Sequence, residues 1–252
     1  MPTIEMESVT KLYKPERRHR REKKWEIGVE DINLTFKQGE FAFIIGSSGA
    51  GKSTLLHLIS GQERPTKGKV YVDNKDLTWA MKLSSGRLSR IFGMVNQEPS
   101  LIRKRTVADN LALAARIQAV RPEREDLILA RINKVLGLVG MAGSQEKYPA
   151  ELSIGQCRRI ELARALINSP PILILDELTA NLDDDCIWDM FHLIQEINRR
   201  GTTVIMATHA SQYVNILRKR VITLVDGHIF GDVEKGRYGD VVQQKPQVIA
   251  IN

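Results

Sequence analysis

The sequence has few of the residues that mark secreted or membrane-spanning proteins. Its 252 residues include only two cysteines, Cys157 and Cys186, too few for a disulfide framework, so a reducing, cytosolic setting is expected. No run of about 18 apolar residues is present, and no transmembrane helix is expected. Residues Met1–Glu5 lack the basic and then apolar pattern of a secretory signal. The length is sufficient for a sizeable core, in one large domain or two modest ones.

Aromatic residues are also scarce, at 6% of the chain, whereas basic residues are in excess. The formal net charge is +7, and part of this excess lies in the block Glu16–Lys24. No Phe, Tyr or Trp interleaves with the block before Trp25, which argues against a base-stacking nucleic-acid surface. The block is either a solvated loop between two early strands or a segment attracted to an anionic membrane face.

The most informative motif is a glycine-rich loop at residues 46–53, which matches the phosphate-binding pattern G-x-x-x-x-G-K-[ST]. The apolar run Phe41–Ile45 before it predicts a buried strand, and Thr54–Ile59 after it predicts a helix. Glycines let backbone N–H groups approach phosphates closely, and the helix N-terminus adds positive charge. This context makes a chance glycine-rich turn a poor alternative.

The loop supplies the candidate nucleotide-binding residues. Lys52 is expected to reach the β- and γ-phosphates, and the Ser53 hydroxyl to help hold Mg²⁺. The full candidate set is Gly46, Ser47, Ser48, Gly49, Ala50, Gly51, Lys52, Ser53 and Thr54.

The remaining patterns predict an α/β fold with a mostly parallel, phosphate-loop (RecA-like) core. Apolar strands at 91–95, 172–175, 203–207 and 221–225 are separated by helical stretches, which is typical of parallel sheets. Alternating residues at 3–6, 31–36 and 69–72 predict an N-terminal antiparallel β subdomain.

A mostly helical insert is predicted at about 98–168. Its helices are expected at 107–115, 125–136 and 157–167, and a further helix at 187–199. Residues 1–240 are interpreted as a single domain, and 241–252 as a loose tail.

Four further motifs follow the loop in a fixed order. Gln97 ends one core strand, Leu152–Gln156 begins a helix, Asp176 and Glu177 end the next strand, and His209 ends another. In this order they resemble the ATP-binding-cassette (ABC) ATPase family, from about residue 4 to residue 231. On its own, Gln97 or His209 would be interpreted as a polar residue with a structural role. The motifs are specific to the family only in combination.

The resemblance implies that the protein binds and hydrolyses ATP with Mg²⁺. Asp176 would support Mg²⁺ through water, and Gln97 would touch both Mg²⁺ and a membrane partner. Glu177 would act as the general base on the attacking water, and His209 would contact the γ-phosphate. Tyr13 stands where the family places an adenine-stacking aromatic, although on its own it would be interpreted as a packing residue.

The resemblance also implies a homodimer in the ATP-bound state. Ser153, Gly155 and Gln156 would form a signature that reaches the ATP of the opposite subunit, and Ala180–Asp183 would couple the two sites. Ile154 and Leu178 depart from the family pattern, which commonly has Gly and Pro there. Neither removes a reacting group.

Within the family, residues 49–55, 206–209, 221–229 and 234–239 resemble the FtsE-type cell-division ATPases, although the block at 16–24 is longer than their compact loop. This implies an FtsX-like integral membrane partner contacted through region 97–113, and a cell-wall hydrolase reached indirectly. The setting would be the cytoplasmic face of a bacterial plasma membrane. Leu101 and Ile102 either dock the partner's helix or pack inside the insert.

Three alternatives remain beside this interpretation. The chain could serve an exporter, lipoprotein-release or macrolide-export complex with the same chemistry. Soluble relatives that act on DNA or ribosomes usually carry two cassettes or a long coiled-coil insertion, and neither is visible. A scaffold that binds ATP without turnover is disfavoured by the intact Glu177.

Overall fold

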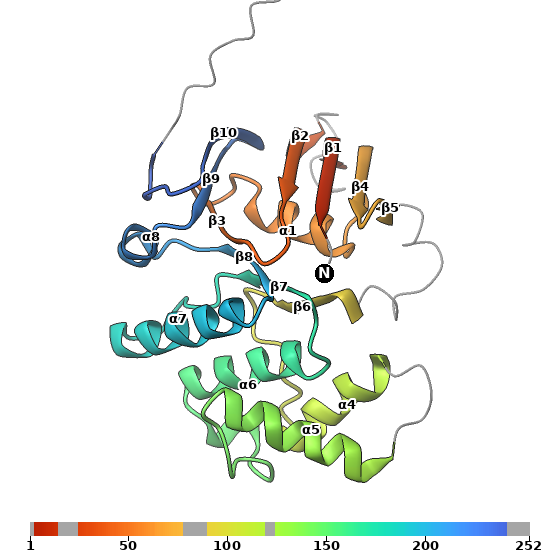
Figure 1. Ribbon diagram of the computed structural model, residues 1–252, viewed down its shortest axis with the longest axis vertical. Coiled ribbons are helices and arrows are strands. Elements are labelled where there is room, and N and C mark those ends of the chain that lie inside the picture. Colours follow the sequence, from red (N-terminus) through yellow and green to blue (C-terminus); the bar gives the residue numbers. More distant parts are fainter. Residues whose placement is uncertain (1–2, 15–24, 78–89, 119–123, 241–252) are drawn as a thin grey trace, which may run out of the picture.

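The computed structural model describes residues 3–14, 25–77, 90–118 and 124–240. Figure 1 shows two sheets above a group of helices formed by the middle of the chain. This arrangement confirms the predicted α/β fold class. The basic block at 16–24 and the expected tail at 241–252 lie outside the described residues. Within the described ranges, no helix has the length and apolarity needed to cross a membrane.

The larger sheet carries most of the candidate functional residues at one edge. It has six strands in the order β10-β9-β3-β8-β7-β6. The pairs from β9 to β6 are parallel, and β10 pairs with β9 in the antiparallel direction. The carboxyl ends of the parallel strands therefore meet at one edge. The strands are β3 (Phe41–Ile45), β6 (Phe92–Val95), β7 (Ile172–Asp176), β8 (Thr203–Ala207), β9 (Arg220–Val225) and β10 (His228–Val233).

The smaller sheet is antiparallel, in the order β2-β1-β4-β5. Its two long strands extend further than the alternation predicted, because register shifts between Met6 and Leu12 break the period of two. The extension places the candidate residue Tyr13 at the end of β1. The strands are β1 (Ile4–Tyr13), β2 (Glu26–Phe36), β4 (Lys67–Val72) and β5 (Lys75–Asp76).

Helices cover the larger sheet and form the predicted insert between β6 and β7. Two of them begin three residues earlier than predicted, because capping side chains start them before the apolar pattern begins. Ser153 caps α6 and Asp183 caps α7, each accepting a backbone N–H from the first turn. The helices are α1 (Lys52–Ser60), α4 (Val107–Gln118), α5 (Glu125–Leu138), α6 (Ile154–Leu166), α7 (Asp184–Arg199) and α8 (Ser211–Leu217), with a 3₁₀ turn at Pro149–Glu151.

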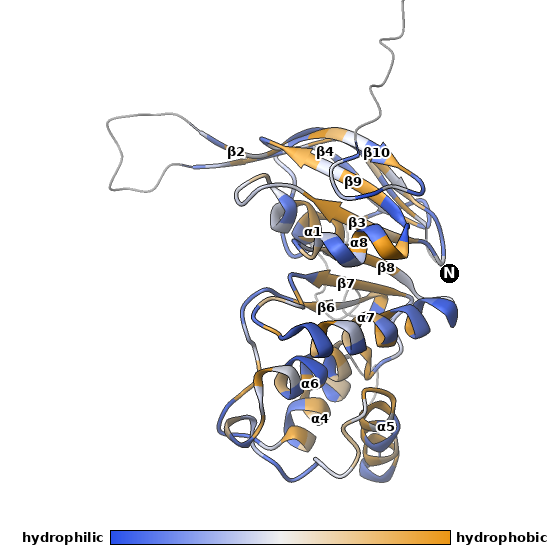
Figure 2. Ribbon diagram, turned by 90° about the vertical axis from the view of Figure 1, so that its left-hand side faces the viewer, coloured by the Kyte–Doolittle hydropathy of each residue, from blue (hydrophilic) through white to orange (hydrophobic). Residues whose placement is uncertain are grey.

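Two apolar clusters lie on opposite faces of the larger sheet. Along β3, Phe41, Phe43 and Ile45 belong to one cluster, while Ala42 and Ile44 belong to the other. The first cluster joins the sheet to the insert and α7, and the second fills the space between the two sheets around α1. Figure 2 shows the hydrophobic residues concentrated along the central strands. Because β3 is buried on both faces, its ends are fixed in position for the loops that follow.

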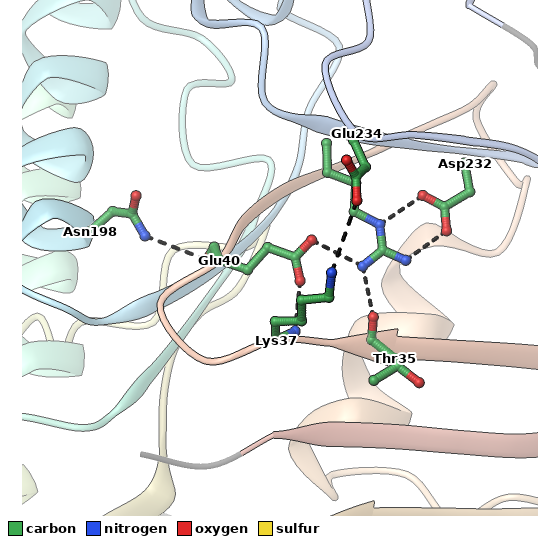
Figure 3. A network of polar contacts seen from close by, with 7 residues as sticks. Thr35, Lys37, Glu40, Asn198, Asp232 and Glu234 are labelled. Carbon is green, nitrogen blue, oxygen red and sulfur yellow. Dashed lines mark hydrogen bonds and ion pairs between the residues drawn. The ribbon is translucent and has the colours of Figure 1, made fainter.

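A half-buried polar network joins the two sheets on the side away from the glycine-rich loop (Figure 3). The Arg220 guanidinium donates to both carboxylate oxygens of Asp232, at 2.7 and 2.6 Å, and to Oε1 of Glu40 at 3.0 Å. It also donates to the Thr35 carbonyl of β2 at 2.7 Å. The Asn198 amide of α7 donates to the Glu40 carbonyl at 3.4 Å. The network therefore connects β9 and β10 to β2 and α7.

Candidate nucleotide-binding and hydrolysis site

The glycine-rich loop connects β3 to α1 and requires glycine at two positions for steric reasons. A Cβ on Gly46 would lie 2.4 Å from the Leu224 carbonyl oxygen, and one on Gly51 would lie 2.3 Å from the Gly28 carbonyl oxygen. Gly51 also has a φ of 100° and is the N-cap of α1. Side chains are therefore excluded from the back of the loop, and its backbone stays free to approach phosphates.

Lys52 folds back over its own loop. Its buried ammonium donates to the carbonyls of Gly46 at 3.0 Å and Ser47 at 3.1 Å. Its third neighbour is Nε2 of His209 at 3.1 Å. The Gly46 and Ser47 acceptors are uncharged carbonyl oxygens. A phosphate group would be a stronger acceptor for the same ammonium, because it carries full negative charge and a carbonyl oxygen does not.

Two buried carboxylates follow one another at the end of β7. Asp176 is the last residue of the strand and Glu177 the next, and both are buried. Oε1 of Glu177 lies 3.9 Å from Nζ of Lys52 and 3.3 Å from Nε2 of His209. Among the described residues, neither Oδ1 of Asp176 nor Oε1 of Glu177 has a hydrogen-bond partner. Such orphaned oxygens are costly to bury and mark positions where a ligand is expected.

The Glu177 backbone is held in an uncommon conformation. Its φ is 49°, in the left-handed region that non-glycine residues rarely adopt. Its N–H donates to the Ala207 carbonyl at 3.1 Å, which ties it to the end of β8 beside His209. Strained backbone of this kind is concentrated at functional sites, and here it turns the Glu177 side chain toward Lys52.

A cavity of about 290 Å³ brings most of the candidate residues together. Tyr13, Gln97, Glu177 and His209 line it along with the phosphate loop. From the loop, the lining residues are Ser48, Gly49, Gly51, Lys52, Ser53 and Thr54. Gly46, Ser47, Ala50 and Asp176 lie behind or beside this surface and are absent from its lining.

Tyr13 lies at the mouth of this cavity. Its hydroxyl is 3.4 Å from Oγ1 of Thr54, and Nζ of Lys11 lies 5.1 Å from its ring centroid. Sequence reasoning missed the adjacent lining residues Glu26, Ile27 and Gly28. A Cβ on Gly28 would lie 2.7 Å from the Tyr13 ring. A glycine inside a strand often marks a place where another group approaches the backbone closely. Gly28 could therefore have indicated from the sequence that this part of β2 lines the cavity.

The signature residues lie apart from this cavity, at the N-terminus of α6. The Ser153 hydroxyl accepts the Gln156 N–H at 3.2 Å, and Oε1 of Gln156 accepts the Ser153 N–H at 3.0 Å. This capping box fixes Ser153 while leaving its hydroxyl proton free to donate. A Cβ on Gly155 would lie 3.4 Å from Sγ of Cys186, so the signature adjoins the first turn of α7.

Ile154 and Leu178, the two residues that depart from the family pattern, differ in burial. Ile154 is 61% exposed, so its side chain does not crowd the signature backbone. Leu178 is fully buried in the cluster that joins the sheet to the insert. Neither residue displaces a reacting group.

Comparison with known proteins identifies the family. Residues 29–180, more than half of the chain, match the family model described as ABC transporter. The chain belongs to the ABC family. The cell division ATP-binding protein FtsE of Bacillus subtilis (strain 168) is 40% identical over 208 residues, which cover 82% of this chain and 90% of the relative.

Two other similarities bear on the function of this ABC protein. The methionine import ATP-binding protein MetN 2 of Rhodococcus jostii (strain RHA1) is 38% identical over 254 residues, 99% of this chain and 70% of the relative. The ATP-binding cassette MJ0796, solved as a dimer in a post-hydrolysis state bound to ADP and Pi, has a TM-score of 0.80 at 30% identity. The similarity covers 92% of this chain and 99% of that one. The protein is therefore an ATPase, as the sequence predicted.

Proposed function

We propose that this ATPase works as a head-to-tail homodimer in which each ATP is held between the cavity of one chain and the signature of the other. The supporting observation is the separation of the reacting groups within one chain. Lys52, Glu177 and His209 meet in the cavity, whereas Ser153 stands outside its lining at a capped helix N-terminus. A single chain thus presents two incomplete halves of a site. The similar cassette MJ0796 is described as dimeric.

Within each half, the roles follow from chemistry. Lys52 binds the β- and γ-phosphates through its ammonium. Glu177, whose Oε1 accepts no hydrogen bond from the described residues, orients and deprotonates the attacking water. His209 donates to the γ-phosphate, and the Tyr13 ring stacks on adenine. Phosphoryl transfer needs mainly such positioning and charge stabilisation.

The residues also fit a Mg²⁺ ion that is shared with the nucleotide. Ser53, Gln97 and Asp176 would hold it through a hydroxyl, an amide and an orphaned carboxylate oxygen. Mg²⁺ is bound typically by one or two carboxylates plus substrate phosphates, and when bound it neutralises developing charge on the phosphate oxygens. No group of three or more His, Cys, Asp and Glu side chains in the described ranges is placed to bind a metal unaided.

The partner surface is a shallow groove between the sheet edge and the insert. Its exposed apolar residues are Ile102, Leu113 and Ile117, the last being 62% exposed. Leu101 and Ile102 were expected either to dock the partner or to pack inside the insert. Leu101 is partly buried against the core, so we assign the docking role to Ile102. The buried Asn110 side chain shapes the loop, accepting the Ile102 N–H at 2.8 Å and donating to its carbonyl at 3.2 Å.

We propose that an FtsX-like membrane protein occupies this groove at the cytoplasmic face of the bacterial membrane. ATP-driven closure and opening of the dimer would then regulate a cell-wall hydrolase during division. Relatives named FtsE support this role at 38–40% identity. The MetN relatives, at similar identity, support a second candidate, the ATPase subunit of a transporter.

Co-purification distinguishes the two candidates. A tagged Glu177→Gln chain, which should stall in the ATP-bound dimer, is recovered from detergent-solubilised membranes with Mg-ATP. A four-span protein with a large external domain, arriving with a wall hydrolase, is the expected result. A larger permease would instead establish the transporter role. An Ile102→Glu version of the same chain is the matched control and should recover neither.

A further inference from the structure

The segment after β10 turns back toward the catalytic edge of the sheet and is firmly held. A Cβ on Gly236 would lie 2.9 Å from Cβ of Val221, so glycine lets the chain run against β9. Beyond it, the Arg237 N–H donates to Oδ2 of Asp240 at 2.7 Å, and the Asp240 N–H donates to the Arg237 carbonyl at 3.1 Å. These contacts close a short turn, and Tyr238 lies inside it.

Tyr238 is fixed by its surroundings and reaches the site. Its N–H donates to Oδ1 of Asn215 in α8 at 2.7 Å, and its ring packs partly buried against the larger core. Its hydroxyl lies 3.5 Å from Nδ1 of His209. Burial, followed by the negative charge of Glu177, raises the pKa of the Tyr238 hydroxyl, so the group stays protonated at neutral pH.

The contacts of His209 define which ring nitrogen carries the proton. Nε2 of His209 lies 3.1 Å from the Lys52 ammonium, which can only donate, and 3.3 Å from Oε1 of Glu177. Because the contact with Lys52 is the shorter one, we assign Nε2 as the acceptor of a Lys52 N–H. A neutral imidazole that accepts at Nε2 carries its proton on Nδ1. The Nδ1–H then faces the Tyr238 oxygen, which serves as the acceptor.

Nucleotide binding requires the opposite arrangement. In the proposed function, Lys52 moves to the phosphates and His209 donates to the γ-phosphate, which needs the proton on Nε2. The ring keeps one proton throughout: Nδ1 releases a proton to water, and Nε2 takes one from water. Once Nδ1 is an acceptor, the Tyr238 O–H must turn to donate to it. A hydroxyl can do both, and a phenyl ring can do neither.

We propose that Tyr238 is a positioning residue that stabilises both tautomers of His209 in turn, accepting from Nδ1–H before ATP binds and donating to Nδ1 afterwards. The inference rests on the proposed role of His209. This role for Tyr238 assigns a function to residues 234–239, which have no other role in the proposed function. The other titratable groups around the imidazole are Lys52 and Glu177, and neither lies against Nδ1.

The direct test is the ¹⁵N spectrum of the His209 ring in the full-length chain, assigned with a His209→Gln variant. The unmodified protein should carry the proton on Nδ1 without nucleotide, and the Glu177→Gln protein with Mg-ATP should carry it on Nε2. Adding Tyr238→Phe should give a mixture of tautomers in both states. Spectra unaltered by Tyr238→Phe would overturn the inference.

Steady-state kinetics supply the second readout. Tyr238→Phe should lower kcat by about 3- to 10-fold, the effect of one hydrogen bond, with KM for ATP unchanged. Tyr71→Phe, which removes a hydroxyl in the small antiparallel sheet, is the matched control and should leave kcat unchanged. A Tyr238→Phe chain with unaltered kcat would also contradict the inference. If His209→Gln itself turns over normally, the proposed role of His209 fails instead.

Discussion

Nζ of Lys52 lies 3.1 Å from Nε2 of His209 and, within the same pocket, 3.9 Å from Oε1 of Glu177. These residues follow three different strands, β3, β8 and β7, whose carboxyl ends meet because the strands are parallel. The topology of the sheet therefore brings together the cation, the carboxylate and the histidine to which the proposal gives roles. Each can be tested separately.

Removing the Lys52 ammonium should weaken ATP binding. A charge-assisted hydrogen bond contributes about 1.5–3 kcal/mol, so Lys52→Ala should raise the Kd for ATP by at least about tenfold. Titration with a fluorescent ATP analogue measures the change. Lys37→Ala, at an exposed surface position, is the control. Equal affinity in Lys52→Ala and the unmodified chain would show that Lys52 does not bind the phosphates.

Replacing the base should separate binding from hydrolysis. Glu177→Gln keeps the size of the side chain but cannot take a proton, so hydrolysis should fall by about 10²- to 10⁴-fold. ATP affinity should be retained, since Lys52 and the loop are unchanged. Single-turnover hydrolysis is the measurement. A rate within a few-fold of the unmodified rate would assign the base elsewhere.

The groove should tolerate a charge without loss of ATP binding. Ile102→Glu places a carboxylate on an exposed, apolar groove residue, so partner recovery from membranes should be lost. ATP affinity should be unchanged. Leu129→Glu, at another exposed apolar position in α5, is the matched control and should retain the partner. Normal partner recovery with Ile102→Glu would move the docking surface away from this groove.

A buried ion pair should make a large contribution to the stability of the loop that carries Gln97. Arg158 donates to Oε2 of Glu161 at 2.8 Å and to the Gln97 carbonyl at 2.7 Å, while Oε1 of Glu161 accepts the Ser100 N–H at 2.6 Å. Glu161→Ala leaves a buried cation unpaired and should lower the free energy of unfolding by about 3–5 kcal/mol.

Urea unfolding measures this loss, and two comparisons define its origin. The double variant Arg158→Met/Glu161→Leu leaves no orphaned charge and should recover part of the stability. Asp126→Ala, which breaks an exposed pair with Arg124, should cost at most about 1 kcal/mol. A Glu161→Ala cost as small as that of Asp126→Ala would mean that the buried pair does not stabilise the loop.

The two thiols should react slowly at neutral pH. Burial, followed by the charge of Glu161, raises the pKa of Cys157, and the hydrogen bond with Asp183 raises the pKa of Cys186. A raised thiol pKa means less thiolate at pH 7, and the thiolate is the reactive form. Alkylation by iodoacetamide should therefore be slower at pH 7 than alkylation of an ordinary thiol, and its rate should still be rising as the pH passes the ordinary thiol pKa of about 8.5. Fast alkylation of either thiol at pH 7 would contradict this.

The secondary structure was predicted most accurately where a short stretch of sequence determines it. Phe41–Ile45 and Thr203–Ala207 are strands with the predicted bounds, because each is a continuous apolar run that stays buried on both faces. The apolar pattern placed the starts of α6 and α7 three residues late, because polar capping turns precede it. The motif at Leu152–Gln156 did mark the start of α6. Tyr13, Gln97, Glu177 and His209 line one cavity, as the resemblance to the ABC family implied.

Contacts between distant residues could not be predicted in this way. Arg220 meets Thr35 and Glu40 across the two sheets, and Tyr238 meets His209 through a turn that no periodicity indicates. Arg158 and Glu161 read as ordinary polar helix residues until α6 is packed against the end of β6. Such pairings depend on tertiary packing, which is absent from local patterns.

The central claim is that one chain's cavity is completed by the other chain's signature, and mixing two inactive variants tests it most directly. Lys52→Ala keeps the signature, and Ser153→Glu keeps the cavity, so each alone should fail to hydrolyse ATP. A head-to-tail dimer of one chain of each contains one intact composite site, and the mixture should regain hydrolysis. The account would be contradicted if the Ser153→Glu chain alone hydrolysed ATP as fast as the unmodified chain. It would also be contradicted if the mixture hydrolysed ATP no faster than either variant alone.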